Sequence, residues 1–232
     1  EVVGNDAYSG LLADYMHLHF LPEKTCLADF QLQEADFMVG DNYVSLFSLH
    51  QLDQLPNQVH THRMHPAYTQ VQLPISFVSG MGLDLPFSHI YNQYFFLDNP
   101  SDLLQKIEKC GREQASLSGI SRENAINKTF NDAFLNEAMA QGRQAVRCAF
   151  NVMVWDTDYY QLLKKNAQVS AGLTQIDAFA TKTEGIVPIL YWAGIPGAAS
   201  QYPCEMTFLT FLEQGACFIN GETHASTSGQ AC

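Results

Sequence analysis

Positively charged residues are scarce in this chain. Lysine and arginine number 12 against 24 aspartate and glutamate residues, which gives a formal net charge of −12 over 232 residues. A surface of this sign repels phosphate backbones, so the composition argues against direct binding of nucleic acid. The basic residues that do cluster alternate with glutamates, a pattern typical of a solvated helix face. They are Lys106, Lys109, Arg112, Arg122 and Lys128.

Long hydrophobic runs are also missing. The most apolar stretch, 186–199, is interrupted by Pro188 and Pro196 and is shorter than the roughly 20 residues that span a bilayer. No signal-peptide pattern is visible. Hydrophobic residues nevertheless make up 47% of the chain and charged residues 16%, which is typical of a globular protein. We therefore expect a soluble, cytoplasmic protein with a packed core.

Cysteines at the spacing of a metal site or a disulfide framework are lacking. Six cysteines are spread along the chain, and no C-x-x-C pair occurs among them. Cys148 lies in an apolar run, as expected of a buried thiol that packs as a small hydrophobe. This usage favours a reducing compartment. The cysteines are Cys26, Cys110, Cys148, Cys204, Cys217 and Cys232.

Motifs that bind nucleotides or build common hydrolase sites are missing as well. The chain has no G-x-x-x-x-G-K-[ST], G-x-G-x-x-G, H-E-x-x-H or G-x-S-x-G sequence. Gly80 and Gly82 form the closest glycine pair, but they lack a third glycine and favour a tight turn. We therefore assign no catalytic, cofactor-binding or metal-binding residue and expect no enzymatic activity from this chain itself.

Two weaker candidates for a site remain. Three histidines within six positions, with a fourth upstream, could share a metal because imidazole is the commonest transition-metal ligand. No carboxylate or cysteine accompanies them at ligand spacing, so an exposed polar loop is the favoured interpretation; the pair His17 and His19 is interpreted as surface residues in the same way. The clustered histidines are His60, His62 and His65, preceded by His50.

Cys204 is the second candidate, as a nucleophile. Cys204 and Cys217 flank a predicted short helix from Pro203 to Gly215, and a helix N-terminus lowers the pKa of a thiol in its first turn. No histidine or asparagine partner can be assigned, so a structural role is favoured. The alternatives that stay open are a small enzyme with a dispersed Cys- or His-based site and a metal-stabilised module.

The hydrophobic pattern predicts an α+β fold. Residues 147–155 alternate between two faces, the first carrying Cys148 and the second Ala149, as in a strand. Residues 11–20 fit a short helix or strand. The other predicted strands are 27–32, 43–49, 89–97 and 186–192. The predicted helices are one long or two tandem helices between 99 and 142, and one capped by Asp156 and Thr157 that runs towards Ala180.

These elements predict a mostly antiparallel sheet covered by two long helices on one face, with an irregular N-terminal part. We expect the irregular part with short strands to occupy residues 1–86 and an α+β domain to occupy residues 87–232. Both parts could also form one continuous domain. The boundary is expected near Pro86, after a stretch rich in proline and glycine.

Five short stretches occur in an order that resembles a known family. They are HIYNQY (89–94), SRENA (121–125), NVMVW (151–155), WAGIPG (192–197) and FLEQ (211–214). Together they resemble the region that precedes the motor domain in TraG-type conjugative-transposon ATPases, relatives of the VirB-four class of type IV secretion ATPases. The similarity extends from about residue 10 to residue 223.

The resemblance implies a non-catalytic region of a conjugative transfer ATPase. Such a region docks to components of the secretion channel and to neighbouring subunits during DNA transfer, at the cytoplasmic face of the inner membrane. In the family the P-loop motor lies further along the chain, so its nucleotide-binding residues have no counterparts here. The start at Glu1, without an initiating methionine, fits a piece of a longer protein.

Two positions depart from the family pattern. Ala198 stands where the family usually has asparagine, and the tail 224–232 diverges. The turn Gly194–Gly197 leads towards the motor in the family and is the first choice for an interaction site, although a turn needed only for the fold is the favoured interpretation.

Overall fold

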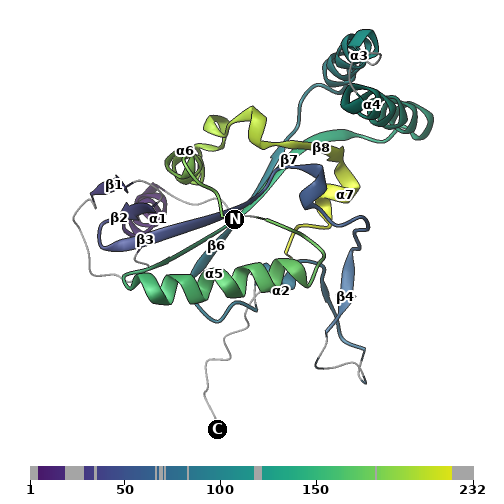
Figure 1. Ribbon diagram of the computed structural model, residues 1–232. Coiled ribbons are helices and arrows are strands. Elements are labelled where there is room, and N and C mark those ends of the chain that lie inside the picture. The colour runs from purple at the N-terminus through teal and green to yellow at the C-terminus, as the bar shows by residue number, and fades with distance from the viewer. Residues whose placement is uncertain are drawn as a thin grey trace.

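A six-stranded antiparallel sheet forms the centre of the molecule (Figure 1). The computed structural model describes residues 5–18, 29–33, 36–65, 67, 70, 72–82, 84–117, 122–180 and 182–220. The strand order is β1-β2-β3-β7-β6, and β8 pairs with β7 beyond the end of β3. Helices pack against this sheet, so the predicted α+β fold with a mostly antiparallel sheet is confirmed.

The strands follow the predicted apolar segments in the centre of the sheet. Those at 43–49, 89–97 and 147–155 are confirmed as β3, β6 and β7, whereas β2 and β8 had not been predicted. Strand β1 covers part of the segment predicted at 27–32, whose first two residues lie outside the described part. The sheet strands are β1 (Phe30–Gln33), β2 (Asp36–Val39), β3 (Asn42–Leu49), β6 (His89–Phe96), β7 (Ala145–Asp156) and β8 (Phe208–Phe211); β4 (His62–Met64) and β5 (Pro74–Ser76) form a separate ribbon.

Ten helical segments surround the sheet in the described part of the chain. Residues 5–17 are helical, which settles the alternative left open at the N-terminus. The α-helices are α1 (Asn5–His17), α2 (Ser79–Gly82), α3 (Pro100–Leu117), α4 (Arg122–Gln141), α5 (Tyr159–Thr174), α6 (Val187–Ala193) and α7 (Leu212–Ala216). Three 3-10 turns are η1 (Leu52–Gln54), η3 (Ala199–Gln201) and η4 (Cys204–Met206). None of these helices is both long and apolar enough to cross a membrane.

Strand β7 is buried on both faces. Its even-numbered residues from Val146 to Val154 belong to one core, which Leu162, Val169 and Leu173 of α5 complete. Its odd-numbered residues Ala149, Met153 and Trp155 belong to a second core on the other face, covered by α1 and α6. Alternation of side chains along a strand therefore places α5 and the α1–α6 pair on opposite sides of the sheet.

The long predicted helical segment between 99 and 142 is two helices, α3 and α4. They pack side by side as a hairpin that projects from one end of the sheet (Figure 1). Their shared core joins Leu103 and Ile107 of α3 to Phe134 of α4, and it meets the sheet at Ala145 of β7 and at Leu209 and Phe211 of β8. Of the long helices, α5 alone lies on a sheet face, so the expectation that two long helices share one face needs correction.

Two local predictions near the C-terminus are wrong. Residues 186–192, predicted as a strand, form α6, with Pro188 in its first turn. A proline suits that position because its missing N–H is not needed there, while it would interrupt a strand. Residues 203–215, predicted as one helix, form η4, the strand β8 and α7.

The predicted cap of α5 is also wrong. Asp158, not Asp156 or Thr157, caps this helix: its side chain accepts a hydrogen bond from the backbone N–H of Tyr160.

Reciprocal hydrogen bonds tie the N-terminal helix to α6. The Tyr15 hydroxyl donates to the carbonyl oxygen of Tyr191 at 2.8 Å, and the Tyr191 hydroxyl donates to that of Tyr15 at 2.9 Å. Gly194, the first residue of the turn after α6, lies against this pair. A Cβ atom there would collide with the Tyr15 hydroxyl and come within 3.2 Å of the Tyr191 carbonyl oxygen. The packing therefore requires glycine at position 194.

Substituting Gly194 tests this packing. We expect Gly194→Ala to lower the free energy of unfolding by about 1–3 kcal/mol, the usual cost of forcing a methyl group into a filled core. Gly10→Ala in α1 is the matched control: a Cβ there meets nothing within 4 Å, and alanine favours helix by about 0.5–1 kcal/mol. Urea unfolding of both variants checks the opposite signs. A Gly194→Ala protein as stable as the parent would contradict the assignment.

Candidate functional site

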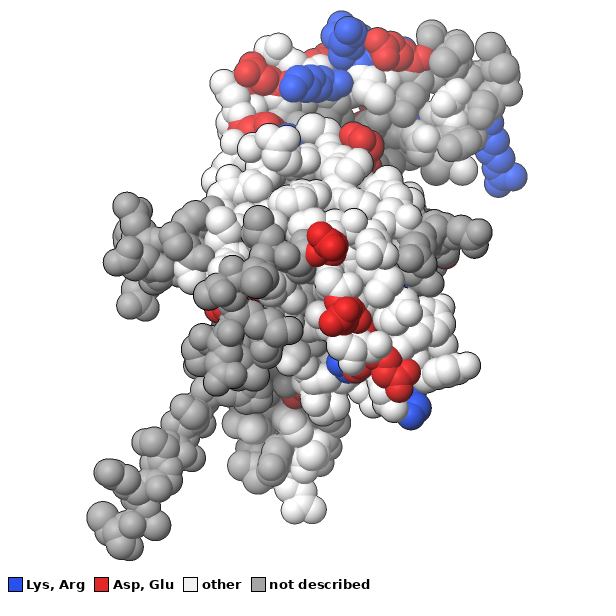
Figure 2. Space-filling model, turned by 90° about the vertical axis from the view of Figure 1, so that its left-hand side faces the viewer, with Lys and Arg blue, Asp and Glu red and all other residues white. Residues whose placement is uncertain are grey.

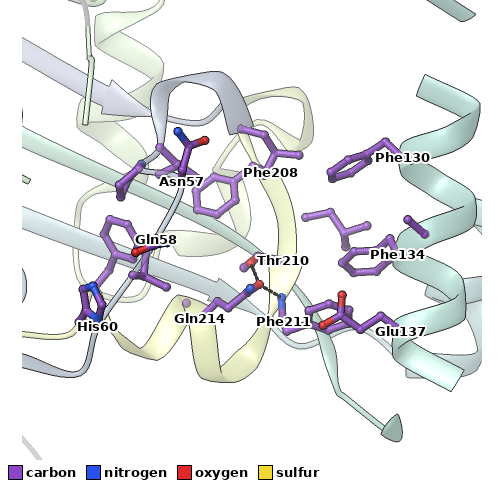
Figure 3. Close-up of a pocket in the computed structure, with 18 residues that line it drawn as sticks. Asn57, Gln58, His60, Phe130, Phe134, Glu137, Phe208, Thr210, Phe211 and Gln214 are labelled. Carbon is purple, nitrogen blue, oxygen red and sulfur yellow. Dashed lines mark hydrogen bonds between the residues drawn. The ribbon is translucent and has the colours of Figure 1, made fainter. Parts of the chain in front are cut away.

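A hollow of about 680 Å³ opens between α4, β8 and the segment that follows β3 (Figure 3). Phe130, Phe134 and Glu137 of α4 form one wall, and residues 55–60 form the opposite wall. Phe208 and Phe211 of β8, with Gln214 of α7, form the floor between them. The hollow exists because the α3–α4 hairpin leaves the sheet at the end of β8 and leaves that end uncovered on one side.

The lining of the hollow is mostly apolar, and three of its polar side chains, Thr210, Gln214 and Glu137, are held by neighbouring groups. The Gln214 side-chain oxygen accepts hydrogen bonds from the Thr210 hydroxyl at 2.8 Å and from the backbone N–H of Phe211 at 3.4 Å (Figure 3). Glu137 pairs with Arg143, which also pairs with Glu213. These contacts hold the floor and the α4 wall in place.

His60 and Glu137 are the only acidic or basic residues among the described residues that line the hollow. They lie on opposite walls (Figure 3). The His60 ring packs edge-on against Phe77, with 6.3 Å between ring centroids, and the Glu137 carboxylate is held by Arg143. A general acid–base pair needs two such groups within reach of one substrate atom. Most of the surface that the hollow offers comes from its aromatic and aliphatic side chains.

Arg143 joins the hairpin to the floor of the hollow. Its guanidinium lies 3.9 Å from the centre of the Phe211 ring, and Phe211 stacks on Phe134 with ring centroids 4.4 Å apart. A cation over an aromatic face is attracted by the ring quadrupole. The stack of guanidinium and two rings thus fixes the position of α4 relative to β8, and with it the width of the hollow.

The side chains of the clustered histidines do not meet at one site. His62 lies on the exposed ribbon strand β4 and contacts its neighbour Thr61, while a ring nitrogen of His65 accepts a hydrogen bond from the backbone N–H of Ala67. His50 is half-buried, and burial lowers its pKa. Across the described residues, no three His, Cys, Asp or Glu side chains come together as a metal site would require. His17 contacts the Ala13 carbonyl oxygen within α1, and His19 lies outside the described residues.

The cysteines differ in accessibility. Cys204 begins η4 and is exposed, and it lies beside the guanidinium of Arg147. Cys217 follows α7, where burial raises its pKa, against the needs of a nucleophile. Cys148 is buried in the core below α5, and burial raises its pKa to about 12. Because η4, β8 and α7 separate them, Cys204 and Cys217 do not flank one helix, and the described residues bring no histidine to Cys204.

The basic residues predicted as a helix face lie on the α3–α4 hairpin. Blue and red side chains alternate over the hairpin at the top of Figure 2, while the body below it shows mainly acidic charge. Lys128 pairs with Asp132 one turn along α4. This mixture of charges fits a solvated helix surface rather than an anion-binding patch.

Thiol labelling tests these environments. We expect iodoacetamide to modify the exposed Cys110 and Cys204 of the native protein and to leave Cys148 unmodified, because only an accessible thiolate reacts. Peptide mass spectrometry measures the extent of labelling at each site, and labelling in urea, where all three should react alike, is the control. Native labelling of Cys148 at the rate of Cys204 would show that the core assignment is wrong.

The Asp98–Arg147 pair predicts a pH dependence of stability. Arg147 binds Asp98 through two hydrogen bonds of 2.6 and 3.2 Å, and these hydrogen bonds, the largest influence, hold the pKa of Asp98 below its ordinary value. The stabilisation is therefore complete above the unfolded pKa of about 4 and is lost as pH falls through the lower folded value. Urea unfolding between about pH 6 and pH 3 should show a shallower decline for Asp98→Asn than for the parent. Equal slopes would contradict the pairing.

No family model matches this chain, and no curated protein is found to be similar to it. The resemblance to TraG-type ATPases therefore depends on the five stretches and their order. Two of these stretches lie on the adjacent strands β6 and β7, and FLEQ joins the last residue of β8 to α7. The described residues of SRENA open α4, and WAGIPG spans the end of α6 and the following turn.

Proposed function

We propose that this chain is the non-catalytic region that precedes the motor of a conjugative transfer ATPase. It docks to components of the type IV secretion channel and to neighbouring subunits of the same ATPase, and it lies at the cytoplasmic face of the inner membrane as a peripheral part of the machine. It binds no nucleic acid itself. ATP hydrolysis belongs to a P-loop domain further along the parent protein.

The apolar hollow beside α4 is the observation that carries a docking role. Its described lining offers aromatic and aliphatic side chains and only two titratable groups, on opposite walls. Apolar surface of this kind, rimmed by polar residues, is typical of a protein interaction site. A dispersed enzyme site built on the histidine loop gains less support, because the one group that shares the hollow with His60 among the described lining residues is Glu137, which lies on the opposite wall and pairs with Arg143. Cys204 does not line the hollow.

The resemblance gains support from the way its stretches meet. Asn92 of the first stretch donates a hydrogen bond of 3.0 Å to Asn151 of the third, across the β6–β7 pair. Gly194 of the fourth stretch packs on the same amide, where a Cβ would lie 3.3 Å from its nitrogen. Residues that are distant in the sequence thus form one contact, as expected if the resemblance reflects a shared folding unit. This contact concerns the fold alone, and the docking role rests on the apolar hollow and on what the resemblance implies.

ATP hydrolysis and channel binding test the proposal together. We expect this chain alone to hydrolyse no ATP above the buffer rate, while the parent protein carrying the downstream segment does. We also expect the chain alone to retain the channel components that the parent retains in co-purification. The parent protein with its P-loop lysine replaced is the control for contaminating ATPase.

Two results would contradict the proposal. ATP hydrolysis by this chain alone would require a catalytic site within its 232 residues. Failure of both the chain and the parent to retain any channel component would remove the docking role.

A further inference from the structure

Helix α4 has apolar residues on two faces, and only one face is covered. Phe134, Leu135 and Ala138 are buried against α3 and the strand ends. On the other face, Ile126 and Phe130 are 59% and 46% exposed, and Ala133 follows at helical spacing. We call Ile126, Phe130 and Ala133 the outer seam. A helix face open to water normally carries polar residues, so an apolar seam of this kind indicates a partner.

The outer seam continues into the hollow beside β8. A second hollow of about 570 Å³ lies along α4 from Arg122 to Ala133, and it shares Phe130 and Ala133 with the first. Together they form one groove along α4 from Arg122 to Glu137, about 23 Å at the 1.5 Å rise per residue of a helix. The opposite wall near its deeper end carries Leu52, Leu55 and Val59.

The shape of this groove favours a helix as its occupant. The outer seam recurs at intervals of four and three residues, the spacing at which side chains of one helix interlock with those of another. An amphipathic helix of about four turns would span the groove. It would complete a three-helix arrangement with α3 and α4, which otherwise contact the rest of the molecule only at Ala145, Phe211 and nearby residues.

Charge selects a basic partner over a second copy of this chain. Glu137 and Glu213 share the single guanidinium of Arg143 at the deep end of the groove, so this end carries an excess of negative charge. Arg122 lies at the other end. The formal net charge of −12 makes two copies repel each other and attracts a cationic protein. Cytoplasmic segments next to membrane spans are enriched in lysine and arginine.

We propose that the groove along α4 binds an amphipathic helix from another protein, with its apolar face on the outer seam and lysine or arginine over Glu137 and Glu213. The proposal rests on the docking function proposed above and names the surface and the chemistry of the partner. A cytoplasmic segment of a membrane component of the channel has the required charge.

Site-specific photocrosslinking in the parent protein tests the groove. The parent is produced together with the channel components, with p-benzoylphenylalanine at position 130, or at position 139 as the control. Met139 is equally apolar, is 65% exposed and lies half a helical circumference from Phe130, outside the groove lining. We expect position 130 alone to crosslink to another protein, at an apolar helical segment containing lysine or arginine that peptide mass spectrometry identifies.

Charge substitutions measure how much the groove contributes to binding of the channel component. Phe130→Glu should weaken retention of the channel component by about tenfold or more, as expected for a central aromatic contact, while Met139→Glu should leave it unchanged. Because nearly half of Phe130 is exposed, both variants should fold, and equal thermal transitions verify this.

The outcomes separate this proposal from the function on which it rests. Crosslinks from position 130 to a second copy, equal crosslinks from position 139, or unchanged retention by Phe130→Glu would each overturn the groove while leaving a docking role intact. An absence of any crosslink from position 130 would also overturn it. If no channel component is retained but position 130 still crosslinks to a basic amphipathic helix of another protein, the groove stands and the proposed function fails.

Discussion

The burial of β7 on both faces is the constraint on which the rest of the structure depends. This strand of 12 residues pairs with β3, β6 and β8, and it supplies side chains to both cores. A strand buried in this way needs a cover on each side, because its apolar side chains alternate between two faces. Helix α5 provides one cover, and α1 with α6 provides the other. The α3–α4 hairpin is left to pack on the strand ends.

The sequence predicted strands correctly where apolar residues alternate along a segment. Residues 43–49, 89–97 and 147–155 carry the apolar alternation of strands, and all three are strands. The strand predicted at residues 186–192 was wrong because the segment is apolar all round, which suits a buried helix as well as a buried strand. Pro188 was the residue that indicated the start of a helix. Strand β8 has only four residues and depends on the free edge of β7, which local sequence does not reveal.

The candidate groove could not be predicted from local sequence patterns. Its walls come from residues 52–60, 122–137 and 208–218, and nothing in the sequence indicates that these segments meet. Ile126 and Phe130 lie in the segment between 99 and 142 that was predicted to be helical, but their exposure follows from where the hairpin leaves the sheet. The sequence did indicate the residues of the Asn92, Asn151 and Gly194 contact, as members of separate stretches, although not that they touch.

The tyrosine pair between α1 and α6 also constrains how the chain reaches its fold. Tyr15 and Tyr191 are 176 residues apart, and each hydroxyl needs the other residue's carbonyl oxygen. During synthesis α1 therefore emerges long before the segment that fixes it, and one face of the central sheet stays uncovered until residues 187–193 leave the ribosome. Contacts of this sequence separation slow folding, and an uncovered apolar face during that interval favours aggregation. The second core therefore cannot close until the residues of α6 have been synthesised, whereas the first core needs no residue of α6.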